Sequence, residues 1–210
     1  GSTYVVGISS MIKTMPRISV VLPFRDAEDT LIESVESMLS QSEGDLELLA
    51  IDDGSIDAGP AIIQDLANSD SRIQFLTTGG DGIVAALNLG LEKAKAPFIA
   101  RMDADDISHA ERLLLQLDFL DQHPDLGLIS SRVEHWTPDG RVRPGYAAYV
   151  EWTNQLLLPD DILRGRFVES PLAHPSVVFR KELVERLGGY RSGIFPEDYE
   201  LWLRWMECGV

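Results

Sequence analysis

The chain has 210 residues, of which 44% are hydrophobic, and 34 acidic against 18 basic side chains give it a formal net charge of −16. This composition is ordinary for one sizeable folded domain with a hydrophobic core. The acidic excess argues against nucleic-acid binding, which requires clustered Lys and Arg, and no basic amphipathic segment suits an anionic membrane surface.

The first half of the chain alternates strand and helix patterns. Apolar, β-branched runs predict strands at residues 18–22 (ended by Pro23), 46–51, 73–76 and 97–102. Apolar residues at helical spacing predict helices at residues 27–39, around 62–66 and at 83–94. Strands that alternate with helices across short loops predict an α/β fold, with a doubly wound, mostly parallel sheet flanked by helices.

Beyond residue 106 the alternation becomes less regular. Residues 113–120 predict a helix and residues 126–130 a strand. Residues 132–142 predict a hairpin that turns at Pro138-Asp139-Gly140. The remaining predicted elements are a helix at 151–163, a strand at 176–179, a short helix at 181–187 and an amphipathic helix at 199–206. With no internal repeat or linker, one domain over residues 16–210 is the economical interpretation.

Both ends of the chain carry separate signals. Residues 1–15, which open with the tag-like dipeptide Gly1-Ser2, predict a tag or disordered leader. The chain stops soon after the last predicted helix, and we expect the natural protein to continue beyond Val210. No apolar stretch reaches membrane-spanning length and no signal peptide is recognisable. The one cysteine, Cys208, excludes an internal disulfide and fits a reducing compartment, so we expect a cytoplasmic protein.

Two carboxylates follow the fourth predicted strand. On an extended backbone Asp103 and Asp105 project from one face, at the sheet edge where open α/β folds bind ligands. They predict a site for Mn²⁺ or Mg²⁺, which prefer oxygen ligands and share them with substrate phosphates. The alternative is a solvated acidic loop, because Asp-x-Asp is common by chance. Arg101 is the nearest positive charge and would stabilise this pair or contact a diphosphate.

Two further loops lie at the same predicted edge. Asp53, after the second strand, can accept the N3–H of uracil, which cytosine lacks, although guanine also offers N–H donors. The alternative for Asp53 is ordinary turn chemistry. Arg25, which follows Pro23, would stack on a base or reach a phosphate, or else form a surface ion pair with Asp26 or Glu28.

The last candidate group lies near the end of the chain. Glu197 and Asp198 open the final predicted helix, where the helix dipole favours negative charge in any protein. As a general base, Asp198 would accept a proton from an attacking hydroxyl, which typically contributes roughly 10²–10⁴-fold. His174 would bind metal or phosphate, although a lone histidine is more often a hydrogen-bonded structural residue.

In their order and spacing these motifs resemble those of the inverting family 2 glycosyltransferases of GT-A fold, of the bacterial type that builds surface polysaccharides. The resemblance extends from about residue 16 to the end, and the segments that carry it are 18–23, 37–41, 47–55, 86–90, 100–106, 174–180, 188–191 and 197–204. It implies a nucleotide-binding half at about 16–106 and a smaller, mixed, acceptor-binding half at about 107–210.

The resemblance also implies the reaction and the partners. A sugar would move from a nucleotide diphosphate sugar, which we expect to be a UDP-sugar, to a hydroxyl of a carbohydrate or lipid-linked acceptor, with inversion at the anomeric carbon. The process would serve cell-surface polysaccharide or glycoconjugate synthesis. The enzyme would be cytoplasmic or peripheral at the inner face of the membrane, with Mn²⁺ or Mg²⁺ as its cofactor and no nucleic-acid partner.

Family roles carry over by position. Asp53 would contact the uracil, with Pro23 and Arg25 lining the base. Asp103 would lie near the ribose or the sugar, and Asp105 would ligate the metal ion. An aromatic residue followed by Asn is common in the family where Arg25 and the residue after it stand here, which leaves the base stacking open.

The implied catalytic base is Asp198, with Glu197 in a supporting role. Two other functions stay open at this point. A sugar-1-phosphate nucleotidyltransferase uses a similar sheet and an acidic metal site, but normally has a glycine-rich, basic loop after the first strand, where residues 23–26 have none. A non-catalytic module that binds nucleotide sugars would retain the same acidic motifs.

Overall fold

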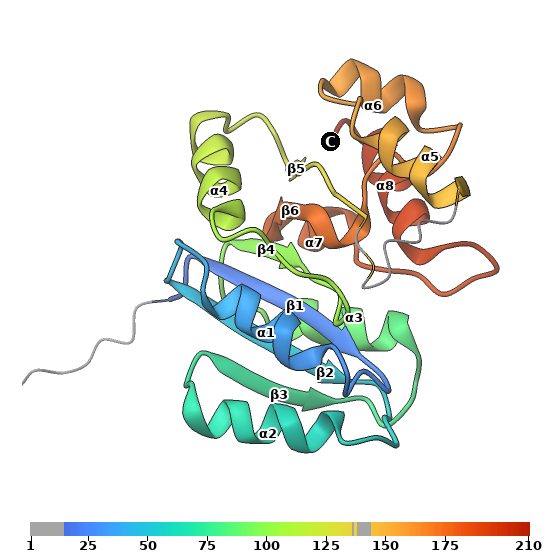
Figure 1. Ribbon diagram of the computed structural model, residues 1–210. Coiled ribbons are helices and arrows are strands. Elements are labelled where there is room, and N and C mark those ends of the chain that lie inside the picture. Colours follow the sequence, from blue (N-terminus) through green and yellow to red (C-terminus); the bar gives the residue numbers. More distant parts are fainter. Residues whose placement is uncertain (1–14, 136, 138–143) are drawn as a thin grey trace, which may run out of the picture.

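The computed structural model describes residues 15–135, 137 and 144–210, and a six-stranded sheet in the order β3-β2-β1-β4-β6-β5 forms its centre (Figure 1). The strands are β1 (Ile18–Phe24), β2 (Leu46–Asp52), β3 (Ile73–Thr77), β4 (Phe98–Arg101), β5 (Leu128–Ser130) and β6 (Val177–Arg180). β3, β2, β1 and β4 run parallel, whereas β6 is antiparallel to both of its neighbours. The predicted α/β architecture with a mostly parallel sheet is therefore confirmed.

Helices cover both faces of the sheet. They are α1 (Leu31–Leu39), α2 (Gly59–Ser69), α3 (Ile83–Lys93), α4 (Arg112–Gln122), α5 (Pro144–Thr153), α6 (Pro159–Gly165), α7 (Lys181–Leu187) and α8 (Glu197–Glu207). α1, α2 and α4 pack on one face, and α3, α7 and α8 pack on the other. Along β2, Leu48 faces the first layer and Leu49 the second, and both are fully buried, as expected for a parallel sheet between two helix layers.

β1 continues through Pro23, two residues further than the sequence predicts. The carbonyl of Val21 accepts the N–H of Met102 (3.1 Å), and this contact closes the pairing between β1 and β4. Backbone N–H and C=O groups point to alternate sides along a strand, so the backbone of Pro23 points toward the β4 side, as that of Val21 does. Pro23 lies beyond Val21, the last residue of β1 that pairs with β4. Proline therefore removes no ladder hydrogen bond there and does not end the strand.

The single helix predicted at residues 151–163 is wrong. The chain forms α5 up to Thr153, leaves the helical conformation, and starts α6 at Pro159. Leu158 is extended, with φ −113° and ψ 153°, and Pro159 occupies the first turn of α6. Proline suits that position because its missing N–H has no intrahelical partner there, whereas within a continuous helix it would clash.

The predicted hairpin at residues 132–142 falls largely outside the described residues, including its turn at 138–140. Residues 132–135 are described and form no strand. Among the residues that the structure describes, no helix is long and apolar enough to cross a bilayer.

Candidate functional site

The loops that follow β1 and β2 are tied together at the carboxyl edge of the sheet. The backbone N–H of Asp26 donates to Ser55 Oγ (3.0 Å), and the carboxylate of Asp26 accepts the N–H of Ile56 (2.8 Å). Arg25 leaves 58% of its side chain exposed and approaches Asp26 only to 3.9 Å. Pro23 is buried in β1. The loose ion pair leaves the guanidinium of Arg25 accessible to a ligand.

Asp53 is held by the loop that follows β3. Its side chain is nearly buried, and Oδ1 accepts hydrogen bonds from Thr78 Oγ1 (2.7 Å) and from the backbone N–H of Gly82 (2.8 Å). Gly54 has φ +78°, and a Cβ there would lie 2.9 Å from the Cα of Gly80, so glycine allows the two loops to touch. Oδ2 of Asp53 accepts no hydrogen bond from any described residue and is therefore available to a ligand.

The loop after β4 begins with a buried ion pair. Arg101 is only 4% exposed in its side chain, and its Nη2 donates to Asp103 Oδ1 (2.6 Å). A second guanidinium nitrogen donates to the carbonyl of Met102, while Nε is buried and has no partner within the described part of the chain. The carbonyl of Asp103 also accepts Ser34 Oγ from α1 (2.8 Å). The orientation of the Asp103 carboxylate is therefore fixed by the buried guanidinium of Arg101, and its backbone is held by Ser34.

Two further carboxylates follow Asp103 in this loop. Asp105 is exposed, whereas Asp106 is half-buried. Burial raises the pKa of Asp106 to about 6, and the negative charges of Asp103 and Asp105 add to the increase. Arg112 lies buried below, with Nη2 donating to the carbonyl of Arg101 (2.9 Å). The loop thus carries three neighbouring carboxylates, and the guanidinium groups of Arg101 and Arg112 are buried below them.

Asp198 and Glu197 form the first turn of α8, next to the segment before β6. Ser170 Oγ lies 3.5 Å from Asp198 Oδ2. Burial raises the pKa of Asp198, backbone hydrogen bonds oppose the increase, and the charge of Glu197 adds to it. A raised pKa makes the ionised carboxylate of Asp198 a stronger base than an exposed aspartate.

His174 pairs with a buried tyrosine. Its Nε2 lies 2.8 Å from the hydroxyl of Tyr190, and its ring also contacts that of Trp202 edge-on, with centroids 6.0 Å apart. Burial, followed by the charge of Arg101, holds the pKa of His174 well below its usual range. The imidazole is therefore neutral near pH 7, with one nitrogen engaged by Tyr190.

The segment leading into β6, which holds Tyr190 through His174, connects the loop after β4 with α8. Arg112 Nη2 donates both to the carbonyl of Arg101 (2.9 Å) and to that of Val177 (3.4 Å), so the segment that leads into β6 lies beside the loop after β4. His174 in the same segment contacts Trp202 of α8, so this segment lies between that loop and α8.

Burial raises the pKa of Tyr190 and the charge of Arg101 opposes this, while the negative charges of Asp198 and Asp103 both raise it further. β1 separates β2 from β4, so the ends of those strands, where Asp53 and Asp103 begin their loops, are about 10 Å apart.

The sequence analysis missed two tyrosines of α5. Burial raises the pKa of Tyr146, and the charges of Asp106, Asp103 and Asp105 raise it further. Burial raises the pKa of Tyr149 to about 12, and the charge of Asp198 contributes. The spacing Tyr146-x-x-Tyr149, one helical turn, was the available signal that both rings share a helix face.

The oxygen donors of this site suit a divalent ion that is shared with a ligand. Within residues 15–135, 137 and 144–210, no cluster of three or more His, Cys, Asp or Glu side chains is arranged to hold a metal ion. Mg²⁺ and similar ions, however, commonly take one or two carboxylates and complete their shell with substrate phosphates. Asp105 and the outer oxygen of Asp103 provide such a partial set.

Sequence comparisons identify relatives of the chain. A family profile described as "Glycosyl transferase family 2" matches residues 19–188. EpsE of Bacillus subtilis (strain 168) is 32% identical over 203 residues, which cover 92% of this chain and 68% of EpsE. A protein of Escherichia coli named "UDP-Gal:alpha-D-GlcNAc-diphosphoundecaprenol beta-1,3-galactosyltransferase" is 28% identical over 197 residues, covering 92% of this chain and 69% of the relative.

Solved structures share the fold. The mannosyltransferase PcManGT of Pyrobaculum calidifontis, in complex with GDP-Man and Mn²⁺, aligns with a TM-score of 0.71 at 21% identity, covering 93% of this chain. TarS of S. aureus in complex with UDP-GlcNAc aligns with a TM-score of 0.70 at 18% identity, covering 90% of this chain. The chain spans about half the length of these solved chains (53% and 52%).

Proposed function

The chain belongs to glycosyl transferase family 2, and on this basis we propose that it moves a sugar from a UDP-sugar to a hydroxyl acceptor in a metal-dependent, inverting reaction. The observation that carries the proposal is that the segment leading into β6 contacts both the candidate metal loop and the helix of the candidate base. Arg112 donates to the carbonyls of Arg101 and Val177, and His174 packs against Trp202 of α8. In this proposal, residues 16–106 bind the nucleotide and residues 107–210 bind the acceptor.

The proposed product is a cell-surface polysaccharide or glycoconjugate. Support comes from the E. coli relative, whose name specifies UDP-Gal as donor and a lipid-linked sugar diphosphate as acceptor. In this proposal the site works at the cytoplasmic side of the membrane, where a lipid-linked acceptor is met at the surface.

Asp53 is the proposed uracil contact. Its Oδ1 is occupied by Thr78 and Gly82, so Oδ2 is the oxygen that accepts the N3–H of the base. Pro23 and Arg25 would line the other side of the base. A carboxylate fixed in this way distinguishes uracil, which offers a donor at N3, from cytosine, which offers an acceptor.

Asp53→Asn will therefore change the base preference. The asparagine oxygen can keep both hydrogen bonds from the protein, which leaves the NH₂ group facing the base. The NH₂ group of asparagine then faces the N3–H of uracil, and two donors form no hydrogen bond. We therefore expect the affinity for UDP to fall about tenfold or more, equivalent to about 1.4 kcal/mol. CDP, whose N3 accepts a hydrogen bond, should gain affinity. Calorimetric titration of UDP, CDP and GDP with Mn²⁺ measures the change.

Asp105 and Asp103 are the proposed metal ligands, and Arg101 is the residue that positions Asp103. When bound, Mn²⁺ or Mg²⁺ would act as a Lewis acid that stabilises the departing nucleoside diphosphate, so that no acid need protonate it. Because Arg101 is buried and bonded to Asp103 Oδ1, its proposed task is to direct the remaining oxygen of Asp103 toward the donor. His174, neutral and paired with Tyr190, is proposed to support the part of the site that would contact the diphosphate.

Asp198 is the proposed base. As the acceptor oxygen forms its bond to the anomeric carbon, the bond to the nucleoside diphosphate breaks and Asp198 takes the proton of the acceptor hydroxyl. Attack from the side opposite the leaving group inverts the configuration. Burial raises the pKa of Asp198 and the charge of Glu197 adds to the increase, so both strengthen it as a base.

The rate of transfer will depend on pH through Asp198. Protonated Asp198 cannot accept a proton, so activity falls as the pH decreases through its pKa. Because burial raises that pKa, we expect the acid limb of kcat to lie above the ordinary aspartate value of about 4. Ser170→Ala removes a hydrogen bond that lowers the pKa of Asp198, and should move the limb to still higher pH. An acid limb at or below about pH 4 would contradict the assignment.

A nucleotide-release assay tests the proposed function as a whole. UDP-, GDP- and dTDP-sugars are incubated with the protein, with and without Mn²⁺, and the free nucleoside diphosphate is measured. We expect release from at least one UDP-sugar that requires the metal. Release of pyrophosphate from UTP and a sugar-1-phosphate would instead favour nucleotidyl transfer.

A further inference from the structure

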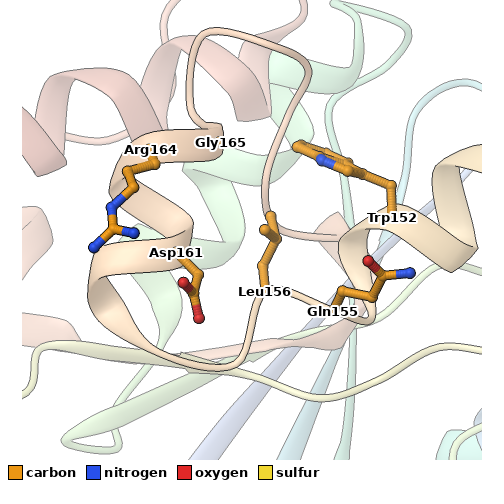
Figure 2. A pocket seen from close by; sticks show the side chains of 6 residues that line it. All are labelled: Trp152, Gln155, Leu156, Asp161, Arg164 and Gly165. Atoms are coloured by element: carbon orange, nitrogen blue, oxygen red, sulfur yellow. The ribbon is translucent and has the colours of Figure 1, made fainter.

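A cavity between α5 and α6 lies apart from the carboxylates described above. Its volume is about 410 Å³, and Figure 2 shows the side chains around it, which belong to Trp152, Gln155, Leu156, Asp161, Arg164 and Gly165. Cavities that hold small molecules commonly measure about 300–1,000 Å³. The space between these helices is therefore large enough for a small ligand.

The walls of this cavity suit a neutral, polyhydroxylated ring. Trp152 offers an aromatic surface, and the amide of Gln155 both donates and accepts hydrogen bonds. Asp161 and Arg164 carry opposite charges, and Arg164 also lies 3.5 Å from Asp160, so no excess positive charge attracts a phosphate. Leu156 is the one aliphatic side chain among the six lining residues, which is too little apolar surface for a lipid chain.

The aromatic wall is held in place by close packing. A Cβ at Gly165 would lie 3.1 Å from Cζ2 of Trp152 and 3.2 Å from Cδ1 of Leu156. Glycine therefore lets α6 approach the edge of the indole, and the ring of Trp152 is positioned by both helices.

A row of aromatic rings on α5 leads from the carboxylates to this cavity. Tyr146 and Tyr149 have ring centroids 6.1 Å apart, and those of Tyr149 and Trp152 are 6.2 Å apart. Thr153, at the end of α5, donates to the carbonyl of Pro171 (3.1 Å), and the adjacent Ser170 has its Oγ 3.5 Å from Asp198 Oδ2, so the end of α5 lies beside the start of α8. The three rings are one helical turn apart, so they follow a single face of α5.

We propose that the α5–α6 cavity binds a sugar unit of the acceptor that lies beyond the unit carrying the reacting hydroxyl. This inference rests on the proposed function, in which Asp198 activates that hydroxyl. With the reacting unit at Asp198 and Tyr149, the next unit reaches Trp152 and the polar groups of Gln155, Asp161 and Arg164. The protein then selects acceptors of at least two sugar units.

Saturation-transfer NMR with defined sugars tests the proposal. The probes are lactose, maltose, cellobiose, N,N′-diacetylchitobiose and α-1,3-mannobiose, each compared with its methyl monosaccharides. We expect at least one disaccharide to receive saturation from the wild-type protein, and its signal to fall at least fivefold in Trp152→Ala and Gln155→Ala. Glu151→Ala is the matched control, because Glu151 is an exposed neighbour on α5 that does not line the cavity.

Three results would overturn the proposal: no disaccharide binds the wild type, the cavity variants bind as well as the wild type, or Glu151→Ala loses binding equally. Gln155 is exposed, so Gln155→Ala keeps the test decisive even where Trp152→Ala fails to fold. Thermal stabilisation of the same samples by UDP with Mn²⁺ reports the donor site separately. Its absence, with disaccharide binding intact, would refute the proposed function and leave the cavity site standing.

Discussion

Asp198→Asn will lower the rate of sugar transfer by roughly 10²–10⁴-fold, the usual contribution of a general base. Asparagine has the shape of aspartate but cannot take the proton from the acceptor hydroxyl. The hydrogen bond from Ser170 can still reach its side-chain oxygen, and the donor site lies on other loops. We therefore expect the affinity for UDP with Mn²⁺ to stay within about twofold of wild type, so that the loss is in kcat.

Glu207→Gln is the matched control for this variant. Glu207 is an exposed carboxylate at the opposite end of the same helix, and neutralising it should leave transfer unchanged. Retention of wild-type turnover by Asp198→Asn would assign the base elsewhere. Tight UDP binding by the natural full-length protein without turnover would instead favour a binding module.

Asp105→Ala will abolish the dependence of UDP binding on a divalent ion. Asp105 is exposed and forms no ion pair with any described residue, so its carboxylate is free to meet a metal. Asp103 cannot replace it fully, because one of its oxygens is already held by Arg101 at 2.6 Å. We expect UDP to raise the melting temperature of the wild type with Mn²⁺ but not without it. In Asp105→Ala, Mn²⁺ should make no difference.

Asp125→Ala serves as the control for a general loss of negative charge. Asp125 is exposed and lies in the turn after α4, away from the carboxyl edge of β1 and β2. It should behave as the wild type with UDP and Mn²⁺. A metal-dependent shift that survives in Asp105→Ala would mean that Asp103 and Asp106 hold the ion.

The sheet could be predicted from the sequence because its strands are continuous apolar runs. β2 and β4 are buried on both faces, and for this reason their sequences are mostly apolar. The ends of helices and strands were harder to predict at two prolines. Pro23 ends no strand because it lies beyond the end of β4, and Pro159 divides one predicted helix into two. The outcome at Pro23 depends on where the neighbouring strand ends, which local patterns do not contain. Pro159 instead follows the local rule that proline begins a helix more readily than it continues one.

The candidate residues could be located from the sequence, but their partners could not. Asp53, Asp103 and Asp198 were placed at strand ends or a helix start, and the structure has them there. The loop of Asp103 and the helix of Asp198 are joined through the segment that leads into β6, which is far from Asp103 in the chain, and this requires α8 to pack beside β6. The ring contacts of Tyr146 and Tyr149 likewise depend on α5, which starts at Pro144, before the helix that the sequence predicts. Their roles, like those of the predicted site residues, stay predictions.

Anomalous X-ray scattering from crystals grown with UDP and Mn²⁺ is the most direct measurement of the central claim. We expect a manganese peak beside the carboxylate of Asp105, the uracil N3 within hydrogen-bond distance of Asp53 Oδ2, and Asp198 facing the diphosphate across the site. A manganese peak away from the loop after β4, or a uracil bound away from Asp53, would contradict the account.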